Sequence, residues 1–499
     1  MLKKSRLTII ILSLLLTTTL YAQEKSNLFT YSTVERSSLS NTANELLNKV
    51  ESAKQVKSVR LIAIHELQSQ SSKQSISVSL PNGNTLNFLN TSAKSIKEGY
   101  HYWRGVDEEY NAIFSLVVSE NDLTGMIRAK GMMFDISALP NTRYHILKEI
   151  DSSKLDDELV PVEVENNDSD TSRKHSNKSK NKISTPTINI LVAYTTDAKN
   201  NHSGNIESSI VLAEGNLDNA LSNSGINADV DVVHTMEVSY SATSDANLDL
   251  CRLTTSETFT PTECSSYSSL NGYIDQVHEK RYDYDAQLVV LITGSGGAGI
   301  AWLRSYTAYA FSIAREDRFV STYTMAHEIG HNIGAQHNKD QDQNPYYSYG
   351  HGYNYNPSDW STIMAYPPTG STRINHFSNP DETFAGVATG TSQYEDNARV
   401  WDNRASVVSA FDPPSPPPSN PTNVTITNPT SIGNPSIDWD DNPENNIDYY
   451  EVWREKKRLS DGYVYQAVHI ASPTSSSYTD TYVFMDGSTH ENDWRYAVK

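Results

Sequence analysis

The sequence predicts an α/β domain with a mixed, mostly parallel β-sheet over residues 186–412, between a β-rich N-terminal region and a C-terminal β-sandwich. Strand-like and helix-like segments alternate from Thr187 to Thr293, an order that favours a parallel sheet covered by helices. Outside this range, apolar and polar residues alternate over short stretches, as in half-buried strands. With 499 residues, the chain is too long for a single hydrophobic core.

Residues 1–22 have the pattern of a secretory signal peptide. Lys3, Lys4 and Arg6 precede an apolar run, Leu7–Leu20, which is shorter than a membrane span and is followed by the small residue Ala22. We therefore predict cleavage after Ala22 and a secreted, extracellular protein. We expect no membrane span in the remaining sequence.

The charge of the chain bears on its partners. It has 60 Asp and Glu residues against 40 Lys and Arg residues. Nucleic-acid binding requires a basic surface, so we expect no nucleic-acid partner. We interpret the acidic excess as a source of solubility.

Residues 23–185 are predicted to be β-rich, with a helix over Asn41–Ser58 and strands over Ser75–Leu80 and Asn111–Val118. They contain no grouping of residues typical of a catalytic site. From Asp151 onward the apolar content falls, and an acidic run is followed by a basic one. This composition predicts a disordered linker up to residue 185, with proteolytic cleavage within Arg173–Thr185.

Residues 186–412 contain the elements of the α/β domain. The predicted strands and helices are, in chain order, Thr187–Tyr194 (strand), Ile206–Leu221 (helix), Ala228–Val238, Ala286–Thr293, Gly299–Arg304 and Ala308–Ala314 (strands), Tyr323–Ile333 and Asn397–Val408 (helices).

The helix Tyr323–Ile333 opens the most informative motif, His327-Glu328-x-x-His331-x-x-Gly334-x-x-His337. Histidines four residues apart share one face of a helix, so both imidazoles can reach one metal ion. Gly334 can adopt a left-handed conformation and turn the chain back, which lets His337 supply a third ligand. Three nitrogen ligands leave one position of a tetrahedral Zn²⁺ open for water, as in catalytic sites. Glu328 is then placed to act as general base.

A methionine turn follows, in Thr362-Ile-Met364-Ala-Tyr366 ahead of two prolines. A histidine helix followed by such a turn resembles the metzincin zinc endopeptidases, and most closely their secreted bacterial reprolysin (adamalysin)-like branch. The resemblance implies one catalytic Zn²⁺, protein or peptide substrates, and a Met364 side chain that packs beneath the metal without ligating it. Asn338 departs from this branch, which usually has Asp directly after the third histidine.

The resemblance implies two further site features. In related branches, a tyrosine two residues after the methionine reaches the metal, so Tyr366 is either an oxyanion-stabilising fifth ligand or a tyrosine at the rim of the site. The family's layout also makes Gly299–Arg304 an exposed edge strand, along which Ile300, Ala301 and Trp302 bind the substrate as an antiparallel strand.

The resemblance also makes residues 23–185 a propeptide together with its linker. The family commonly silences its zinc with a propeptide cysteine, and this region has none. Inhibition then requires a carboxylate such as Asp107 at the metal, or steric cover of the cleft.

Cys251 and Cys264 are the two cysteines of the chain. In a secreted protein an isolated pair most often forms a disulfide, which we predict here. Metal ligation by these cysteines is the alternative, although the histidine set is complete without them.

A proline-rich linker, residues 413–419, separates the α/β domain from residues 420–499, which resemble a fibronectin type III module. We predict strands in this module at Ser436–Trp439, Tyr449–Arg454, Tyr463–Ile470 and Trp494–Val498. The complete module needs seven strands and the sequence stops near the sixth. Either the sequence is truncated, which we favour, or the module is completed from elsewhere.

Three functions compete: a zinc endopeptidase, a catalytically inactive adhesin that keeps the fold, and a zinc amidase or small-peptide hydrolase. Glu328 favours an enzyme, because a binding protein does not need a general base. A long cleft would favour protein substrates over small ones.

Overall fold

The computed structural model of the chain describes residues 27–120, 122–164, 185–341, 345–356, 359–414, 420–427, 433–443, 447–460, 462–483 and 492–499. The predicted signal peptide, residues 173–184 of the predicted cleavage stretch and residues 415–419 of the proline-rich linker lie outside these ranges. The chain divides into two compact units, Met1–Pro413 and Pro414–Lys499.

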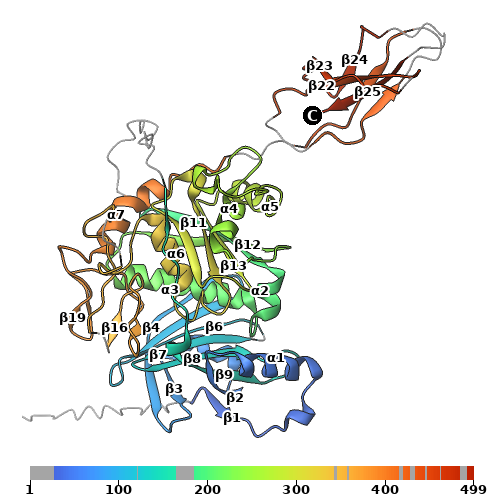
Figure 1. The fold of residues 1–499 in the computed structure, drawn as a ribbon. Helices are drawn as coiled ribbons and strands as arrows, with labels where there is room; N and C mark the ends of the chain where they lie inside the picture. Colours follow the sequence, from blue (N-terminus) through green and yellow to red (C-terminus); the bar gives the residue numbers. More distant parts are fainter. Residues whose placement is uncertain are drawn as a thin grey trace, which may run out of the picture. The chain divides into compact units, whose positions relative to one another are not determined.

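The N-terminal region forms a nine-stranded antiparallel sheet (Figure 1). Its strands follow the order β1-β2-β9-β8-β7-β6-β5-β4-β3. Their bounds are β1 Phe29–Tyr31, β2 Val56–Ile64, β3 Ser75–Ser79, β4 Thr85–Lys97, β5 Tyr100–Asp107, β6 Ala112–Val118, β7 Leu123–Ala129, β8 Met132–Ala138 and β9 His145–Ile150.

The predicted helix Asn41–Ser58 is too long. The helix α1 spans Asn41–Ser52, and β2 begins at Val56 and pairs with β9. The side chain of Ser40 caps the helix N-terminus by accepting from the N–H of Ala43. Because Val56 and the residues after it complete the sheet, long-range strand pairing overrides the local helical pattern there.

The second region contains a six-stranded sheet in the order β10-β14-β15-β13-β11-β12. β14 and β15 pair antiparallel, and every other neighbouring pair is parallel, which confirms the predicted mixed, mostly parallel sheet. The strands are β10 Val162–Glu163, β11 Thr187–Thr195, β12 Asp229–Val238, β13 Leu288–Thr293, β14 Gly299–Leu303 and β15 Phe311–Arg315.

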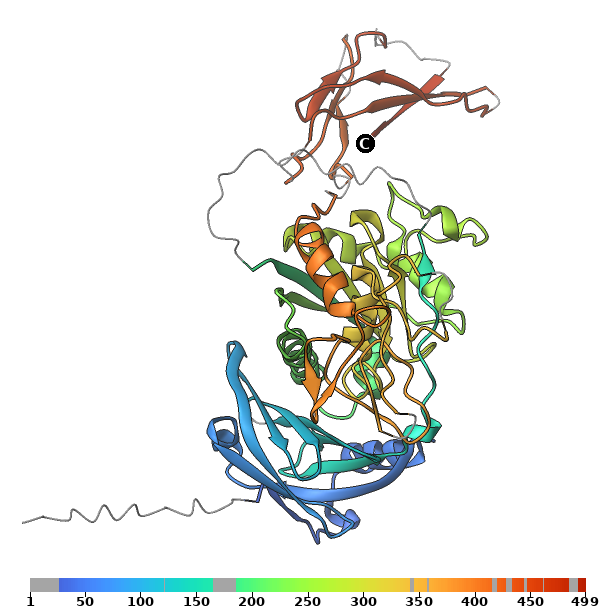
Figure 2. The ribbon, with the colours of Figure 1, turned by 90° about the vertical axis from the view of Figure 1, so that its left-hand side faces the viewer.

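Helices cover this sheet, as parallel strands require. One of them, α3, also packs against strands of the N-terminal sheet, so it lies between the two sheets (Figure 1 and Figure 2). The buried residues Tyr102, Val117 and Met126 of the N-terminal sheet join the same hydrophobic core as α3. The helices are α2 Thr196–Asn201, α3 Ile206–Asn223, α4 Ala246–Thr254, α5 Gln276–Asp283, α6 Thr324–Ile333 and α7 Asn397–Val408.

The segment between α6 and α7 has little regular structure. It contains two short strand pairs, β16 Trp360–Ser361 with β17 Thr372–Arg373, and β18 Thr383–Phe384 with β19 Val387–Ala388. Its buried side chains, such as Ile363, Met364 and Phe377, pack into the core shared by α6 and α7. This segment therefore lines one side of α6.

The C-terminal unit has two antiparallel three-stranded sheets. Ile437 of one sheet and Val452 and Val498 of the other belong to one hydrophobic cluster, so the sheets pack face to face. The predicted strand Tyr463–Ile470 is shorter than expected, and two strands were not predicted. The strands are β20 Thr425–Thr427, β21 Ser436–Asp438, β22 Val452–Arg458, β23 Val468–Ala471, β24 Ser477–Thr479 and β25 Asn492–Val498.

Within the part of the chain that the structure describes, the helices are all too short or too polar to traverse a lipid bilayer.

Candidate active site

The helix α6 presents His327 and His331 one above the other, because four residues make slightly more than one helical turn. It is fixed to the sheet by Asn332, whose side chain donates to the carbonyl oxygens of Trp302 at 2.9 Å and Phe311 at 3.1 Å. All residues of α6 are buried. The histidines therefore sit on a rigid element.

The chain leaves α6 at Gly334, as the motif predicts. Gly334 has a φ of 120°, a conformation that residues with side chains rarely adopt. His337 thereby returns to the helix, and its Nε2 lies 3.0 Å from that of His327 and 2.9 Å from that of His331. In the described residues, these three histidines are the cluster able to hold a metal ion.

The chemistry of the three rings fits zinc. The Nδ1 atoms of His327 and His331 each lie 2.8 Å from a backbone carbonyl oxygen, which places the proton of each neutral ring on Nδ1. Their Nε2 lone pairs nevertheless lie 3.0 Å apart, where they repel unless a cation lies between them. Burial lowers the pKa of His327 to about 4 and holds those of His331 and His337 well below the usual range. Neutral imidazole is the form that binds zinc.

Glu328 lies beside these rings, and both of its carboxylate oxygens are buried without a hydrogen-bond partner. Burial raises its pKa well above the usual value, and the charge of Glu158 raises it further. The carboxylate lies against the backbone of Gly299 in β14, so closely that a Cβ there would come within 2.2 Å of Oε1. A residue without a side chain is therefore required at position 299.

Met364 and Tyr366 both lie next to the histidine cluster. Met364 is fully buried, and its sulfur packs against Gly330, between the two helical histidines. The ring of Tyr366 lies 4.1 Å from that of His337, measured between centroids. Its N–H donates to the side-chain oxygen of Asn338 at 3.1 Å, which ties the methionine turn to the third histidine.

The start of the predicted disordered linker is ordered and lies in the cleft, so that prediction is wrong for its first part. Leu159 N–H donates to the Gly299 carbonyl at 2.9 Å, and β10 then pairs with β14 in parallel. Ile300, Ala301 and Trp302 are consequently buried. The predicted exposed edge strand is covered in the uncleaved chain.

The same linker places Glu158 in a buried ion pair with Arg373. The Arg373 nitrogens lie 2.6 Å and 3.1 Å from the two carboxylate oxygens, an arrangement in which both groups are bidentate. The Tyr366 hydroxyl donates to the carbonyl oxygen of Glu158 at 2.9 Å. The linker thus covers Tyr366 and the edge of β14, while steric inhibition, the second of the two predicted devices, stays a prediction.

Asp107 has no part in this contact, so its predicted role is wrong. Its carboxylate accepts the N–H groups of Asn87 and Tyr110 within the N-terminal sheet. The first bond ties the end of β5 to the neighbouring strand β4, and the second closes the turn that follows β5. The residue therefore serves the sheet that contains it.

The predicted disulfide is present. Cys251 in α4 is bonded to Cys264, and both residues are buried in the cluster that contains Trp302. Trp302 itself donates from its indole N–H to the Thr254 hydroxyl at 2.8 Å. The bridge therefore supports the face of the sheet that carries β14.

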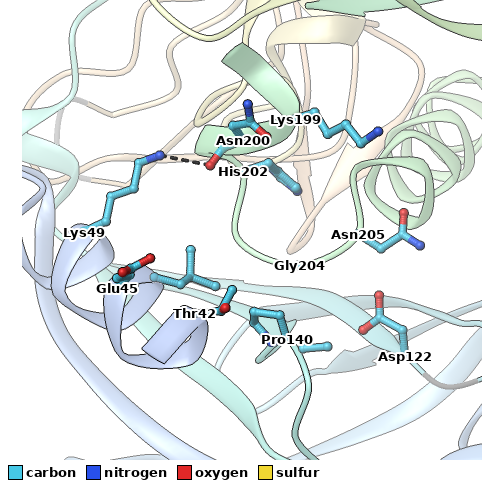
Figure 3. Close-up of a pocket in the computed structure, with 12 residues that line it drawn as sticks. Thr42, Glu45, Lys49, Asp122, Pro140, Lys199, Asn200, His202, Gly204 and Asn205 are labelled. Carbon is cyan, nitrogen blue, oxygen red and sulfur yellow. Dashed lines mark hydrogen bonds between the residues drawn. The ribbon is translucent and has the colours of Figure 1, made fainter. Parts of the chain in front are cut away.

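A separate cavity lies where α1 of the N-terminal region faces residues 199–205 (Figure 3). Lys49 crosses this space and donates to the carbonyl oxygen of Asn200 at 3.0 Å (Figure 3). The other labelled side chains include Glu45, Asp122 and Asn205. Part of the contact between the N-terminal region and the second region is therefore polar and loosely packed.

Fold and site together define a metzincin-like zinc metallopeptidase. The family model described as "Metallo-peptidase family M12" matches residues 184–378. The chain belongs to this family and is a zinc metalloendopeptidase.

Its curated relatives share one activity in their names. A peptidyl-Asp metalloendopeptidase of Xanthomonas campestris pv. campestris is 30% identical over 318 residues, which cover 62% of this chain and 71% of the relative. An enzyme of the same name from Stenotrophomonas maltophilia (strain R551-3) is 30% identical over 348 residues, covering 67% of this chain and 78% of the relative. A third, from Pseudomonas aeruginosa, is 26% identical over 268 residues, 46% of this chain and 41% of the relative.

Two residues of the site were missed by sequence reasoning. Glu158 stands in an acidic run, Asp156-Asp157-Glu158, that reads as solvated linker charge. Arg373 follows no fixed spacing from the histidines. Buried arginines are rare enough to attract notice, but the sequence alone does not distinguish them from exposed ones.

Proposed function

We propose that the protein is a secreted endopeptidase whose zinc is held by His327, His331 and His337, with Glu328 as general base, and that it cleaves peptidyl-Asp bonds as its relatives do. The observation that carries the proposal is the convergence of three Nε2 atoms beside a buried carboxylate with no partner. The signal-peptide pattern supports secretion. The names of the relatives support the substrate class.

A zinc ion at this site supplies Lewis acidity, which polarises the scissile carbonyl and makes a water molecule more acidic. Glu328 takes a proton from that water as its oxygen forms a bond to the carbonyl carbon. The carbon–nitrogen bond then breaks, and Glu328 passes the proton to the departing amine. Glu328 is available for this exchange, because it follows His327 on α6 and neither of its carboxylate oxygens has a hydrogen-bond partner.

Tyr366 is placed to assist. Its hydroxyl donates to a linker carbonyl in the uncleaved chain, so the same hydroxyl can donate to a substrate carbonyl once the linker leaves. Met364 keeps the helical histidines in place through its contact with Gly330. β14 offers its edge to the substrate main chain.

The test uses the processed, secreted protein and denatured protein substrates. We expect cleavage that a zinc chelator abolishes and added zinc restores, with about one zinc per chain. Glu328→Ala should retain the zinc and lose at least about 1000-fold in kcat/KM, because the proton transfer it performs is lost. Glu279→Ala, which removes an exposed carboxylate on α5, is the matched control and should behave as wild type. Chelator-resistant cleavage, or full activity of the Glu328 variant, would refute the mechanism.

A further inference from the structure

Arg373 occupies a buried position between α6 and the methionine turn. Its guanidinium donates to the carbonyl oxygen of Thr322, just before α6, at 2.8 Å, and to that of Ala365, just after Met364, at 3.0 Å. Two backbone segments of the active site thus fix the direction in which the guanidinium points. The same two terminal nitrogens also donate to a carboxylate, that of Glu158, while Nε is buried without a hydrogen-bond partner.

Glu158 occupies this position as one residue of a bound peptide would. Its side chain enters the Arg373 pocket and also accepts the hydroxyl of Thr324, one helical turn before Glu328, at 2.8 Å. Its backbone carbonyl is held by Tyr366, and the next N–H is bonded to β14 at Gly299. The main chain at Glu158 therefore contacts Tyr366 and β14, while its side chain contacts Arg373 and the start of α6.

We propose that Arg373 is the specificity-determining residue that binds the acidic side chain of the substrate, and that Glu158 fills its pocket in the uncleaved chain. This inference rests on the proposed endopeptidase function and assigns its preference for an acidic residue to one side chain. A buried guanidinium without a counter-charge is strongly destabilising. Once the linker departs, an acidic substrate side chain restores the ion pair and a neutral one does not.

The direction of the linker along β14 differs from the direction expected of a substrate. From Leu159 to Glu163 it runs parallel to β14. A substrate that binds β14 antiparallel, as the family's layout predicts, runs the opposite way. The linker therefore places the Glu158 side chain against Arg373, while its main chain runs past Glu328 in the direction opposite to that expected of a substrate.

The first experiment measures kcat/KM of the processed protein on peptides that differ at one residue, Asp, Glu or Asn. Wild type should prefer Asp and Glu over Asn by about 100-fold or more, since a site built to bind a charged group rejects its neutral analogue. Arg373→Gln should reduce this ratio to below about 10, mainly by loss on the acidic peptides, with zinc content unchanged. Arg318→Gln is the control: Arg318 is also buried nearby, but its closest carboxylates are Asp156 and Asp317.

The assignment would be overturned if Arg373→Gln kept the wild-type preference for acidic peptides over the Asn peptide. It would also be overturned if only Arg318→Gln lost that preference. Chelator-sensitive cleavage with no acidic preference in wild type would also overturn it, while leaving the proposed endopeptidase function intact. Absence of chelator-sensitive cleavage of any peptide would instead count against the proposed function.

The second experiment needs no turnover, and its main comparison uses wild-type protein alone. A synthetic peptide of residues 155–164 should bind the processed protein, and Glu158→Gln in the peptide should weaken binding by about 10- to 100-fold, as for loss of a charged hydrogen-bonded partner. Glu163→Gln, at an exposed position of the same segment, should have little effect. On Arg373→Gln protein the wild-type and Glu158→Gln peptides should bind equally. Equal binding of both peptides to wild-type protein would overturn the proposal.

Discussion

The contact between β14 and the proposed general base can be tested with a single methyl group. In Gly299→Ala the added Cβ would lie 2.2 Å from Glu328 Oε1 and 2.6 Å from Thr324 Cγ2. Ordinary contact requires at least 3.4 Å, so the carboxylate must move by about 1.2 Å. A displacement of this size in a catalytic group costs roughly 100-fold in rate. We expect kcat/KM to fall by that factor, with a loss of about 1–3 kcal/mol in the free energy of unfolding from overpacking.

The assay combines kcat/KM on an acidic peptide with the zinc content of the same sample. Zinc should remain at the wild-type level, because the three atoms nearest to the new methyl group belong to Glu328 and Thr324 and not to a histidine. The matched control is Gly297→Ala in the same glycine-rich loop. Its Cβ would meet Leu159 of the linker at 2.9 Å and Ala246 at 3.2 Å, so the processed enzyme should stay close to wild type. A folded Gly299→Ala enzyme with wild-type turnover would refute the assigned position of the general base.

Two further predictions concern stability. Replacing Cys251 and Cys264 by serine should lower the free energy of unfolding by about 3 kcal/mol without changing zinc content, given the short loop that the disulfide closes, and an unchanged denaturant midpoint would contradict this. Glu214 in α3 is buried with only the Val232 N–H as a partner for Oε1, and burial raises its pKa to about 7. Because the folded pKa exceeds the unfolded value of 4.5, the stability linked to its neutral form is complete below pH 4.5 and is lost as the pH rises through about 7. Glu214→Gln should abolish this loss of roughly 3 kcal/mol between pH 4.5 and 8, as measured by unfolding at both pH values, and an unchanged pH slope would count against it.

The elements that the sequence predicted well are those fixed by local spacing. The histidine motif specifies a helix, a glycine turn and a returning ligand within eleven residues, and the structure brings all three rings together. The helix Asn397–Val408 and the strand Thr187–Thr195 were equally accessible, because their apolar periodicity is continuous. The alternation of strands and helices predicted a mostly parallel sheet, but it did not predict the order of the strands within that sheet.

What the sequence did not reveal depends on contacts between distant residues. Glu158 and Arg373 are 215 positions apart, and the residues next to each of them in the sequence do not indicate that it is buried. The end of α1 was misplaced because the β2–β9 pairing draws Val56 into the sheet. The covered edge of β14 was missed for the same reason: a two-residue strand, β10, has no periodicity to detect.

The ion pair connects latency to the assembly of the site. The bonds of Arg373 to Thr322 and Ala365 do not involve the linker, so we expect the guanidinium to stay oriented when the linker is removed. Burying that cation during folding is tolerated because Glu158 supplies the opposite charge. Burial alone would raise the pKa of Glu158, but the neighbouring Arg373 guanidinium holds it well below the usual range. Removing the linker leaves a preorganised donor group without a carboxylate, which is the state that favours an acidic ligand most strongly. Under this proposal, the linker completes the Arg373 pocket in the uncleaved chain, and an acidic substrate side chain takes over its charge after processing.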